Sequence, residues 1–274
     1  MSDEIKDVIH SRIWEEEATE NDPFTAHACF CNGYNVYSDV LEKASYPEYL
    51  YLLFRGERPS TQVARALEIL TIAIANPGPR DPSVHAAMAA GVGGSPAAAA
   101  LMAALAAGAG VSGGAREVFL CMQLWADCGC KLEAWQKALH APSAIGKKME
   151  VWPEAGHPPG FAPYAKCCAT PVQQTLAALA SHLNNGNIAW LQQHRESLEL
   201  VSGHPLAMTG VISAALIDLG FTPKAGEMLT LYFRLPGAAA HALEQGETGI
   251  RNFPFFAIDI LNDPATNVDA GAKQ

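Results

Sequence analysis

The sequence predicts an all-α protein. Nine segments carry apolar residues at helical spacing, and several of them begin with a capping residue or a proline. No segment alternates apolar and polar positions with β-branched residues over a sustained length, so we expect no β-sheet. Hydrophobic residues make up 49% and charged residues 17% of the 274 residues, which indicates a globular chain with a large core.

The predicted helices follow one another from residue 46 to residue 235. Ser60 and Asp81 stand where N-caps belong, and Pro82 and Pro96 suit first helical turns. Gly220 follows an apolar run and is expected to end a helix. The predicted ranges are 46–54, 61–75, 82–90, 96–107, 117–139, 170–184, 188–200, 208–219 and 223–235.

Residues 141–170 interrupt this helical pattern. The segment is rich in proline and glycine, and it contains Trp152, His157 and the adjacent Cys167 and Cys168. A long irregular stretch inside a helical protein is usually functional or disordered, and the aromatic and cysteine content indicates order. We therefore expect functional residues in this segment.

The charge pattern argues against nucleic acid and membrane partners. A net charge of −10 leaves no basic face for phosphates, although a few local arginines can still bind an anionic substrate. Residues 86–115 carry no charge, but they are mostly alanine and glycine and are interrupted by Pro96, unlike a membrane-spanning helix. The N-terminal residues are charged and polar, unlike a signal peptide, so we expect a cytoplasmic protein.

The seven cysteines raise the question of a metal site. Structural zinc prefers cysteine pairs separated by two residues, whereas the pairs in this chain are closer together. We therefore expect small, reduced, buried thiols and no bound metal, and keep a metal protein as an alternative. The close pairs are Cys29 and Cys31, Cys128 and Cys130, and Cys167 and Cys168.

Five motifs occur along the chain in a fixed order. Residues 32–60 read NGYNVYSDVLEKASYPEYLYLLFRGERPS, residues 113–118 read GGAREV, and residues 159–161 read PGF. Residues 210–223 read GVISAALIDLGFTP, and residues 233–245 read FRLPGAAAHALEQ, the most specific of the five. In this order the chain resembles the citrate synthase superfamily, and most closely its short citryl-CoA lyase-like branch.

The resemblance implies a fold, substrates and an assembly. It implies a citrate synthase-like two-domain helical fold, with a large domain from residues 1–112 and 204–274 and a small inserted domain from residues 113–203. The family binds a four-carbon keto acid and makes or breaks a carbon–carbon bond to the acetyl group of a coenzyme A thioester. The implied substrates are a carboxylate and an acyl-CoA, with no metal, and the implied assembly is a homodimer or higher homo-oligomer.

The family's catalytic groups are an Asp base, two His and carboxylate-binding Arg, and several do not carry over. The family His before the G-G-A motif falls on Ser112, whose hydroxyl can donate one hydrogen bond but cannot hold a positive charge. The family Asp falls on Thr209, which is no general base near neutral pH. The His of an upstream motif falls on Pro77.

The loop around PGF allows two alignments. If PGF sets the register, the family His falls on Ala162, and the distance to the next helix favours this register. If GHP sets the register, His157 takes that place. Arg234 matches the Arg that holds a substrate carboxylate, and its planar guanidinium suits a bidentate clamp. Arg251 is matched to a basic residue near the CoA site.

Two functions follow from a family cleft with substituted catalytic positions. The first is a C–C lyase or acyltransferase acting on a CoA thioester with a rebuilt active site, in which His157 is the best replacement base because its loop is irregular and proline-rich. The second is a non-catalytic relative, either a ligand sensor or a subunit that pairs with an active homologue. Further candidates for the base are His204, which is also expected to contact substrate, His85 and Asp81.

Overall fold

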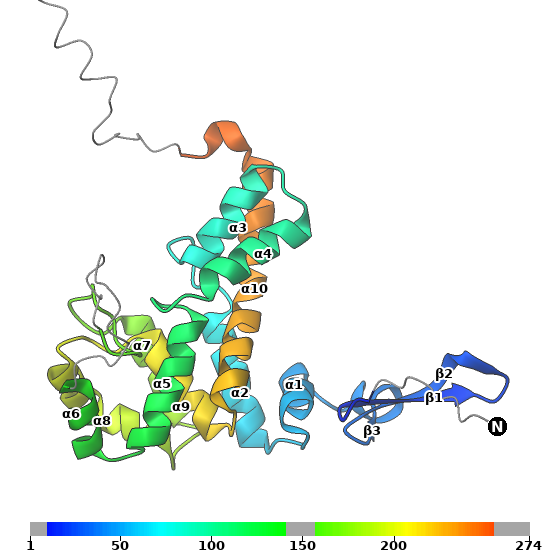
Figure 1. Ribbon diagram of the computed structural model, residues 1–274, viewed down its shortest axis with the longest axis horizontal. Helices are drawn as coiled ribbons and strands as arrows, with labels where there is room; N and C mark the ends of the chain where they lie inside the picture. The colour runs from blue at the N-terminus through cyan, green and yellow to red at the C-terminus, as the bar shows by residue number, and fades with distance from the viewer. Residues whose placement is uncertain (1–9, 141–156, 255–274) are drawn as a thin grey trace, which may run out of the picture.

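The computed structural model describes residues 10–140 and 157–254, and α-helices dominate it, which confirms the all-α fold class (Figure 1). Residues 141–156, the first part of the irregular segment, lie outside the described residues. Two short helical turns flank the α-helices, η1 (Val36–Val40) and η2 (Ile250–Asn252). The α-helices are α1 (Tyr46–Arg55), α2 (Thr61–Ile74), α3 (Pro82–Val92), α4 (Ala97–Gly108), α5 (Ala115–Cys128), α6 (Leu132–His140), α7 (Thr170–Ala180), α8 (Asn187–Ser202), α9 (Met208–Asp218) and α10 (Pro223–Thr248).

Several helix ends follow the local signals in the sequence. The Ser60 hydroxyl accepts a hydrogen bond from the third backbone N–H of α2, and the Asp81 carboxylate accepts one from the Ser83 N–H in α3. Both are side-chain N-caps, which satisfy N–H groups that a helix leaves free. Gly220 ends α9 with φ 80°, a conformation that glycine adopts without strain. These three boundary predictions are confirmed.

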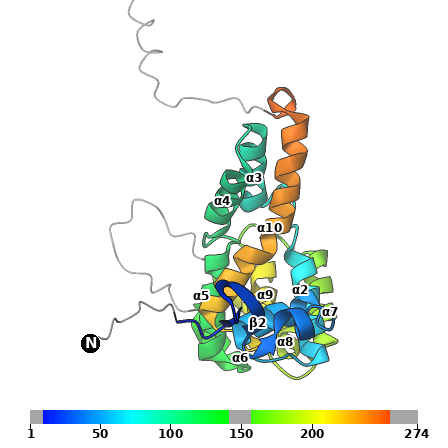
Figure 2. The same cartoon turned by 90° about the vertical axis from the view of Figure 1, so that its right-hand side faces the viewer.

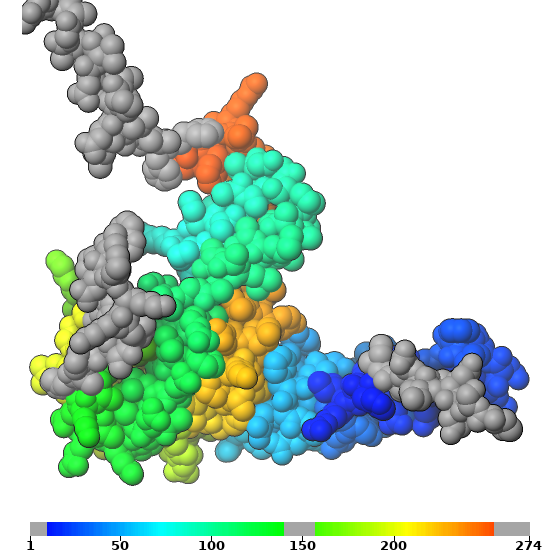
Figure 3. All heavy atoms as spheres, viewed as in Figure 1, coloured from blue at the N-terminus to red at the C-terminus, as the bar shows by residue number. Residues whose placement is uncertain are grey.

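The expectation that the chain has no β-sheet is wrong at its N-terminal end. Strands β1 (Trp14–Thr19), β2 (Asp22–Cys31) and β3 (Tyr34–Asn35) form an antiparallel sheet in that order. The sheet extends from α1 away from the helical body and forms a separate lobe (Figures 1 and 3). Most of its side chains are exposed on both faces, so neither face selects apolar residues, and the alternation that reveals a half-buried strand is missing.

The main hydrophobic core joins α1, α2, α5 to α9 and the first half of α10. Leu67, Met122, Leu216 and Leu229 are completely buried in it. Trp125 from α5 contacts the rings of α6 and α8 edge-on within the same core. These helices form the lower body in Figures 1 and 2, and the irregular loop after residue 157 packs against them.

A second, smaller core joins α3, α4 and the C-terminal half of α10. It consists mainly of alanine, and Val84 and Ala238 are among its completely buried members. The three helices rise together above the body in both ribbon views (Figures 1 and 2). No helix in the described part of the chain, α4 included, has the length and apolar character needed to cross a membrane. The predicted limits of the inserted domain, residues 113 and 203, stay a prediction.

Two predicted helix ranges need correction. The predicted helix 117–139 is two helices, because Gly129 adopts φ 52° and ends α5 before α6 begins. The predicted helix 223–235 does not end there: α10 continues through Pro236 to Thr248. The Gly237 N–H donates to the Ala75 carbonyl oxygen at 2.8 Å, so the backbone beside the proline is bonded to another segment. Packing against α3 and α4 then favours continuation of the helix over the local signal of the proline.

Candidate active site

A buried carboxylate joins three segments that are far apart in the sequence. Glu117 lies in the first turn of α5, and its side chain is 3% exposed. One carboxylate oxygen, Oε2, accepts the Gly113 N–H at 2.5 Å. The other, Oε1, accepts the Gly160 N–H at 2.9 Å and the Thr209 hydroxyl at 2.7 Å. The glycine turn before α5, the PGF loop and the start of α9 therefore meet at one side chain.

Glu117 lies at the N-terminal end of α5, where acidic side chains are commonly found. The first backbone N–H groups of a helix are unpaired and create a positive end, which stabilises an acidic side chain in the first turn. Three donors satisfy the two oxygens, as buried polar groups require. The carboxylate is therefore engaged in holding the loops together, and it has little capacity left to act as a catalytic base.

His157 lies beside this carboxylate. Its Nε2 atom is 3.9 Å from Glu117 Oε2, and its side chain is 8% exposed. Its other ring nitrogen, Nδ1, is buried and has no hydrogen-bond partner among the described residues. Leaving a buried polar atom unpaired costs about 1–3 kcal/mol, and such atoms often mark functional positions. The His157 ring is thus placed where its Nδ1 atom is available to a bound molecule.

Arg234 is held next to the same glycine turn. Its Nη2 donates to the Gly113 carbonyl oxygen at 2.7 Å, and its Nη1 lies 3.6 Å from the Asp81 carboxylate at the start of α3. The side chain is 9% exposed, and its Nε atom is buried without a partner in the described part of the chain. The helices α3, α5 and α10 therefore place a second buried group with an available nitrogen near Gly113.

The structure brings four of the six predicted site residues to this neighbourhood. His157, Thr209 and Arg234 contact Glu117 or Gly113 directly. Ser112 precedes Gly113 in the turn, and its side chain is exposed. The Thr209 hydroxyl donates to Glu117, so this residue positions a loop and is not free to take a proton. The catalytic and binding roles of these residues stay predictions.

The other two predicted residues lie elsewhere in the described structure. His204 lines a separate pocket with Cys168, Arg195 and Glu199. Arg251 is exposed in η2, roughly 25 Å along the helix axis from Arg234 at 1.5 Å per residue. Neither makes a hydrogen bond or ion pair with the Glu117 cluster in the described part of the chain. The geometry therefore supplies no direct support for their predicted contact with the same ligand.

Two alternatives from the sequence can be placed as well. The Ala162 N–H donates to the Pro205 carbonyl oxygen, and its methyl side chain cannot carry a proton, whereas His157 lies at the cluster.

Burial raises the pKa of the Cys121 thiol to about 12 and that of Cys168 to about 11, so both are protonated at neutral pH. Among the described residues, no three His, Cys, Asp or Glu side chains are grouped as metal ligands.

The sequence alone does not single out the residue at the centre of the cluster. In the sequence, Glu117 is expected only to begin a helix and to belong to the GGAREV motif. A signal was available, because Glu117 is the one acidic residue in the first turns of a helix whose face carries Ala115, Val118, Cys121 and Met122, all buried. A charged residue among apolar positions beside a glycine turn indicates a buried hydrogen-bonding role.

Comparison with known proteins gives matches by structure. No family model matches the sequence, and no curated protein matches it. A citryl-CoA lyase from Hydrogenobacter thermophilus superposes with a TM-score of 0.69 at 17% identity, over 95% of this chain and 99% of that chain. An ATP citrate lyase from Methanothrix soehngenii, in complex with citrate and coenzyme A, gives 0.69 at 16% identity, over 93% of this chain and 42% of that chain. A citrate synthase from Thermoplasma acidophilum, in a ternary complex with carboxymethyl coenzyme A and oxaloacetate, gives 0.57 at 16% identity, over 80% and 57%.

The chain has the citrate synthase-like helical fold. Within that class, the citryl-CoA lyase is similar to this chain over nearly the whole length of both. The chain spans less than half of the ATP citrate lyase, so the match there is to one part of a longer protein. At these identities the likeness establishes the fold.

Proposed function

We propose that the protein is a citryl-CoA lyase-like enzyme that cleaves a carbon–carbon bond in the CoA thioester of a hydroxy-carboxylic acid at the Glu117 cluster. One observation supports this most directly. His157 and Arg234 are both more than nine-tenths buried beside the same glycine turn, and each has a nitrogen without a partner among the described residues. Cleavage of such an adduct requires a base and a group that binds a carboxylate. His157 lies beside Glu117, and Arg234 donates to Gly113, which is itself hydrogen-bonded to Glu117.

The proposed reaction is a reverse aldol cleavage. His157 Nδ1 removes the proton of the substrate hydroxyl, the adjacent carbon–carbon bond breaks, and the hydroxyl carbon becomes the carbonyl of a keto acid. The bonding electrons pass to the thioester as an enolate, to which the Ser112 hydroxyl donates a hydrogen bond. The proton on His157 then goes to the enolate carbon, which yields the acetyl thioester. Arg234 holds a substrate carboxylate throughout.

A second candidate is a non-catalytic carboxylate or CoA sensor, or a subunit that pairs with an active homologue. The observation in its favour is that the polar groups of the Glu117 cluster, Thr209 among them, are already engaged with one another. Both Glu117 oxygens already accept hydrogen bonds, and the Thr209 hydroxyl donates one of these bonds. A site of this kind keeps binding capacity while offering His157 alone as a proton acceptor.

Incubation with citryl-CoA is expected to release acetyl-CoA and oxaloacetate. Replacement of His157 by Gln is expected to lower kcat about a hundredfold, because a positioned base contributes this much. Replacement of Arg234 by Gln is expected to raise KM about tenfold through loss of the charged clamp. Coupled detection of oxaloacetate measures both, with His27→Gln on the exposed strand β2 and Arg65→Gln at an exposed position of α2 as matched controls.

The two candidate functions give different results in the same experiment. No turnover, together with a rise in Tm on addition of CoA or a dicarboxylate that Arg234→Gln abolishes, would favour the sensor. Turnover that appears only when a second citrate synthase-like chain copurifies would favour the partner subunit. Turnover that survives His157→Gln would contradict the proposed role of His157.

We also propose a homodimer formed through α4. Residues 86–115 carry no charge, and the outer face of α4 exposes alanines and Met102, which is 62% exposed. The helices α3 and α4 stand clear of the body in the space-filling view (Figure 3). An uncharged, apolar helix face of this kind is typical of a subunit interface.

Replacement of Met102 by Glu is expected to shift the protein from dimer toward monomer. A charge buried in the centre of an apolar interface has no partner, and this weakens association by roughly several kcal/mol, which is enough to dissociate a dimer. The matched control is Met228→Glu on α10, because Met228 is 59% exposed and lies outside the proposed interface. Sedimentation velocity measures the shift, and equal behaviour of the two variants would contradict the proposed interface.

A further inference from the structure

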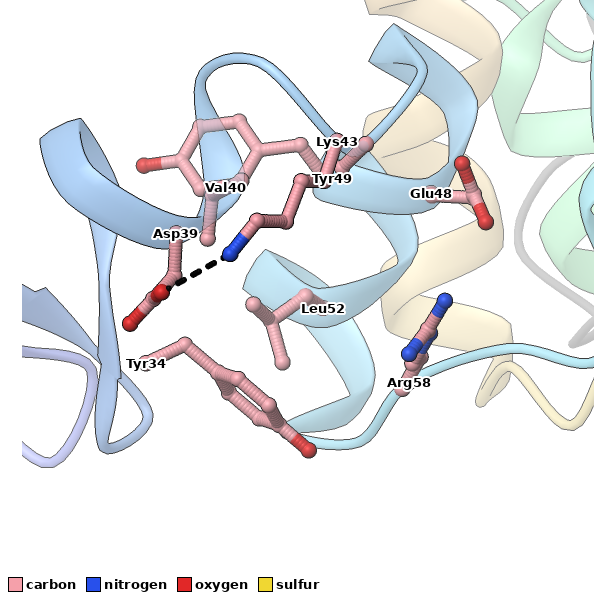
Figure 4. Close-up of a pocket in the computed structure, with 9 residues that line it drawn as sticks. Tyr34, Asp39, Val40, Lys43, Glu48, Tyr49, Leu52 and Arg58 are labelled. Atoms are coloured by element: carbon pink, nitrogen blue, oxygen red, sulfur yellow. Dashed lines mark hydrogen bonds and ion pairs between the residues drawn. The ribbon is translucent and has the colours of Figure 1, made fainter.

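A pocket of about 250 Å³ lies between the N-terminal sheet and α1 (Figure 4). Strand β3 contributes Tyr34, helix α1 contributes Tyr49 and Leu52, and the loop after α1 contributes Arg58. None of these side chains contacts the Glu117 cluster. The pocket is therefore separate from the site proposed for cleavage, and the proposed function makes no use of it.

The walls of the pocket suit a flat ring. Tyr34, Tyr49, Leu52 and Val40 line it with aromatic and aliphatic surface, and Tyr34 keeps 44% of its surface exposed. Figure 4 shows Leu52 in the middle of the pocket and the Tyr34 ring along its lower side. Small-molecule sites commonly combine such apolar walls with a few polar groups that fix orientation. An aromatic ring can pack against the exposed tyrosine and Leu52.

The charged groups around the pocket differ in whether they are already paired. Lys43 forms an ion pair with Asp39 at 3.1 Å. The Glu48 carboxylate accepts the Ser45 N–H at 2.8 Å and the Ser45 hydroxyl at 2.9 Å, and these bonds lower the pKa of Glu48. Arg58 makes no direct hydrogen bond or ion pair with any residue that the structure describes, although its positive charge also lowers the pKa of Glu48, less than the two Ser45 bonds do. The guanidinium is therefore the charged group of the pocket whose hydrogen-bond donors are not already engaged.

We propose that this pocket binds a small aromatic anion, with its ring against Tyr34 and Leu52 and its phosphate or carboxylate on Arg58. A guanidinium binds either anion through two parallel N–H donors. In Figure 4 Arg58 lies at the opposite end of the pocket from the Lys43–Asp39 pair, which leaves the space over Leu52 for the ring. The volume is below the usual range for drug-sized ligands, so it suits one ring system with one anionic group.

The test uses the full-length protein and isothermal titration calorimetry. The two probes are AMP, an aromatic phosphate, and indole-3-acetate, an aromatic carboxylate; ribose 5-phosphate is the control that lacks a ring. At least one aromatic probe is expected to bind with a millimolar or lower Kd and to bind more tightly than ribose 5-phosphate. Arg58→Gln is expected to weaken that binding about tenfold, and Tyr34→Ala by roughly fivefold.

Two matched variants separate this site from others. Arg65→Gln removes an exposed arginine on α2 and is expected to leave probe binding unchanged. Arg234→Gln is expected to leave probe binding unchanged as well while it impairs the proposed cleavage, so that failure of one proposal is distinguishable from failure of the other. The inference is overturned if neither aromatic probe binds in the millimolar range. It is also overturned if ribose 5-phosphate binds equally well, or if Arg58→Gln and Tyr34→Ala both bind as the unmodified protein does.

Discussion

Replacement of Glu117 by Ala is expected to lower the free energy of unfolding by about 4 kcal/mol. The change removes a buried acceptor and leaves the Gly113 N–H, the Gly160 N–H and the Thr209 hydroxyl without their partner. Each unsatisfied buried donor costs about 1–3 kcal/mol, reduced where water enters the cavity. Urea unfolding followed by circular dichroism measures the loss as a fall in the midpoint concentration.

Two variants make this expectation specific. Glu68→Ala removes an acidic residue from an exposed ion pair with Arg65 and is expected to cost less than about 1 kcal/mol. Glu117→Gln keeps one acceptor oxygen but places an NH₂ group against a donor, so an intermediate loss is expected. Equal stability of Glu117→Ala and Glu68→Ala would show that the three hydrogen bonds do not hold the loops together.

The Glu117 cluster also shows how much of a candidate site can be predicted from the sequence. The order of motifs was sufficient to predict the fold and to place Ser112, Thr209 and Arg234 in one neighbourhood. Aligning catalytic positions one by one directs attention to the residues that changed, and Glu117 is not one of them. The Thr209 hydroxyl donates its hydrogen bond to Glu117, which lies 92 residues away in the sequence. No local sequence pattern predicts which carboxylate accepts a bond over such a separation.

The N-terminal sheet and the long helix α10 show two other limits. The strands β1 and β2 pair through backbone hydrogen bonds while most of their side chains stay in solvent, so the apolar periodicity used to find strands is absent. In α10 the local signal is physically real, since Pro236 lacks the backbone N–H for a helical hydrogen bond, but it does not end the helix. Burial of Ala238 and Ala242 against α3 and α4 favours continuation of the helix past it.

Replacement of Gly237 by Ala is expected to destabilise the protein by about 3 kcal/mol. A Cβ atom at this position would lie 2.5 Å from the Ala75 carbonyl oxygen and 2.7 Å from the Asn76 Cα. Both neighbours are backbone atoms at the end of α2, and the Gly237 N–H donates to that same carbonyl oxygen, so neither can move without loss of the bond. The added methyl group must therefore push α10 away from α2, one turn from Arg234.

The matched control is Gly246→Ala in the same helix. A Cβ atom there would meet only the Gly91 carbonyl oxygen, at 3.6 Å, which is ordinary contact. Because alanine has the higher helix propensity, this variant is expected to raise the free energy of unfolding by about 0.5–1 kcal/mol. Thermal unfolding should therefore move in opposite directions for the two variants. A loss of similar size in both would mean that the cost arises from filling any glycine in α10, and not from the close approach of Gly237 to the end of α2.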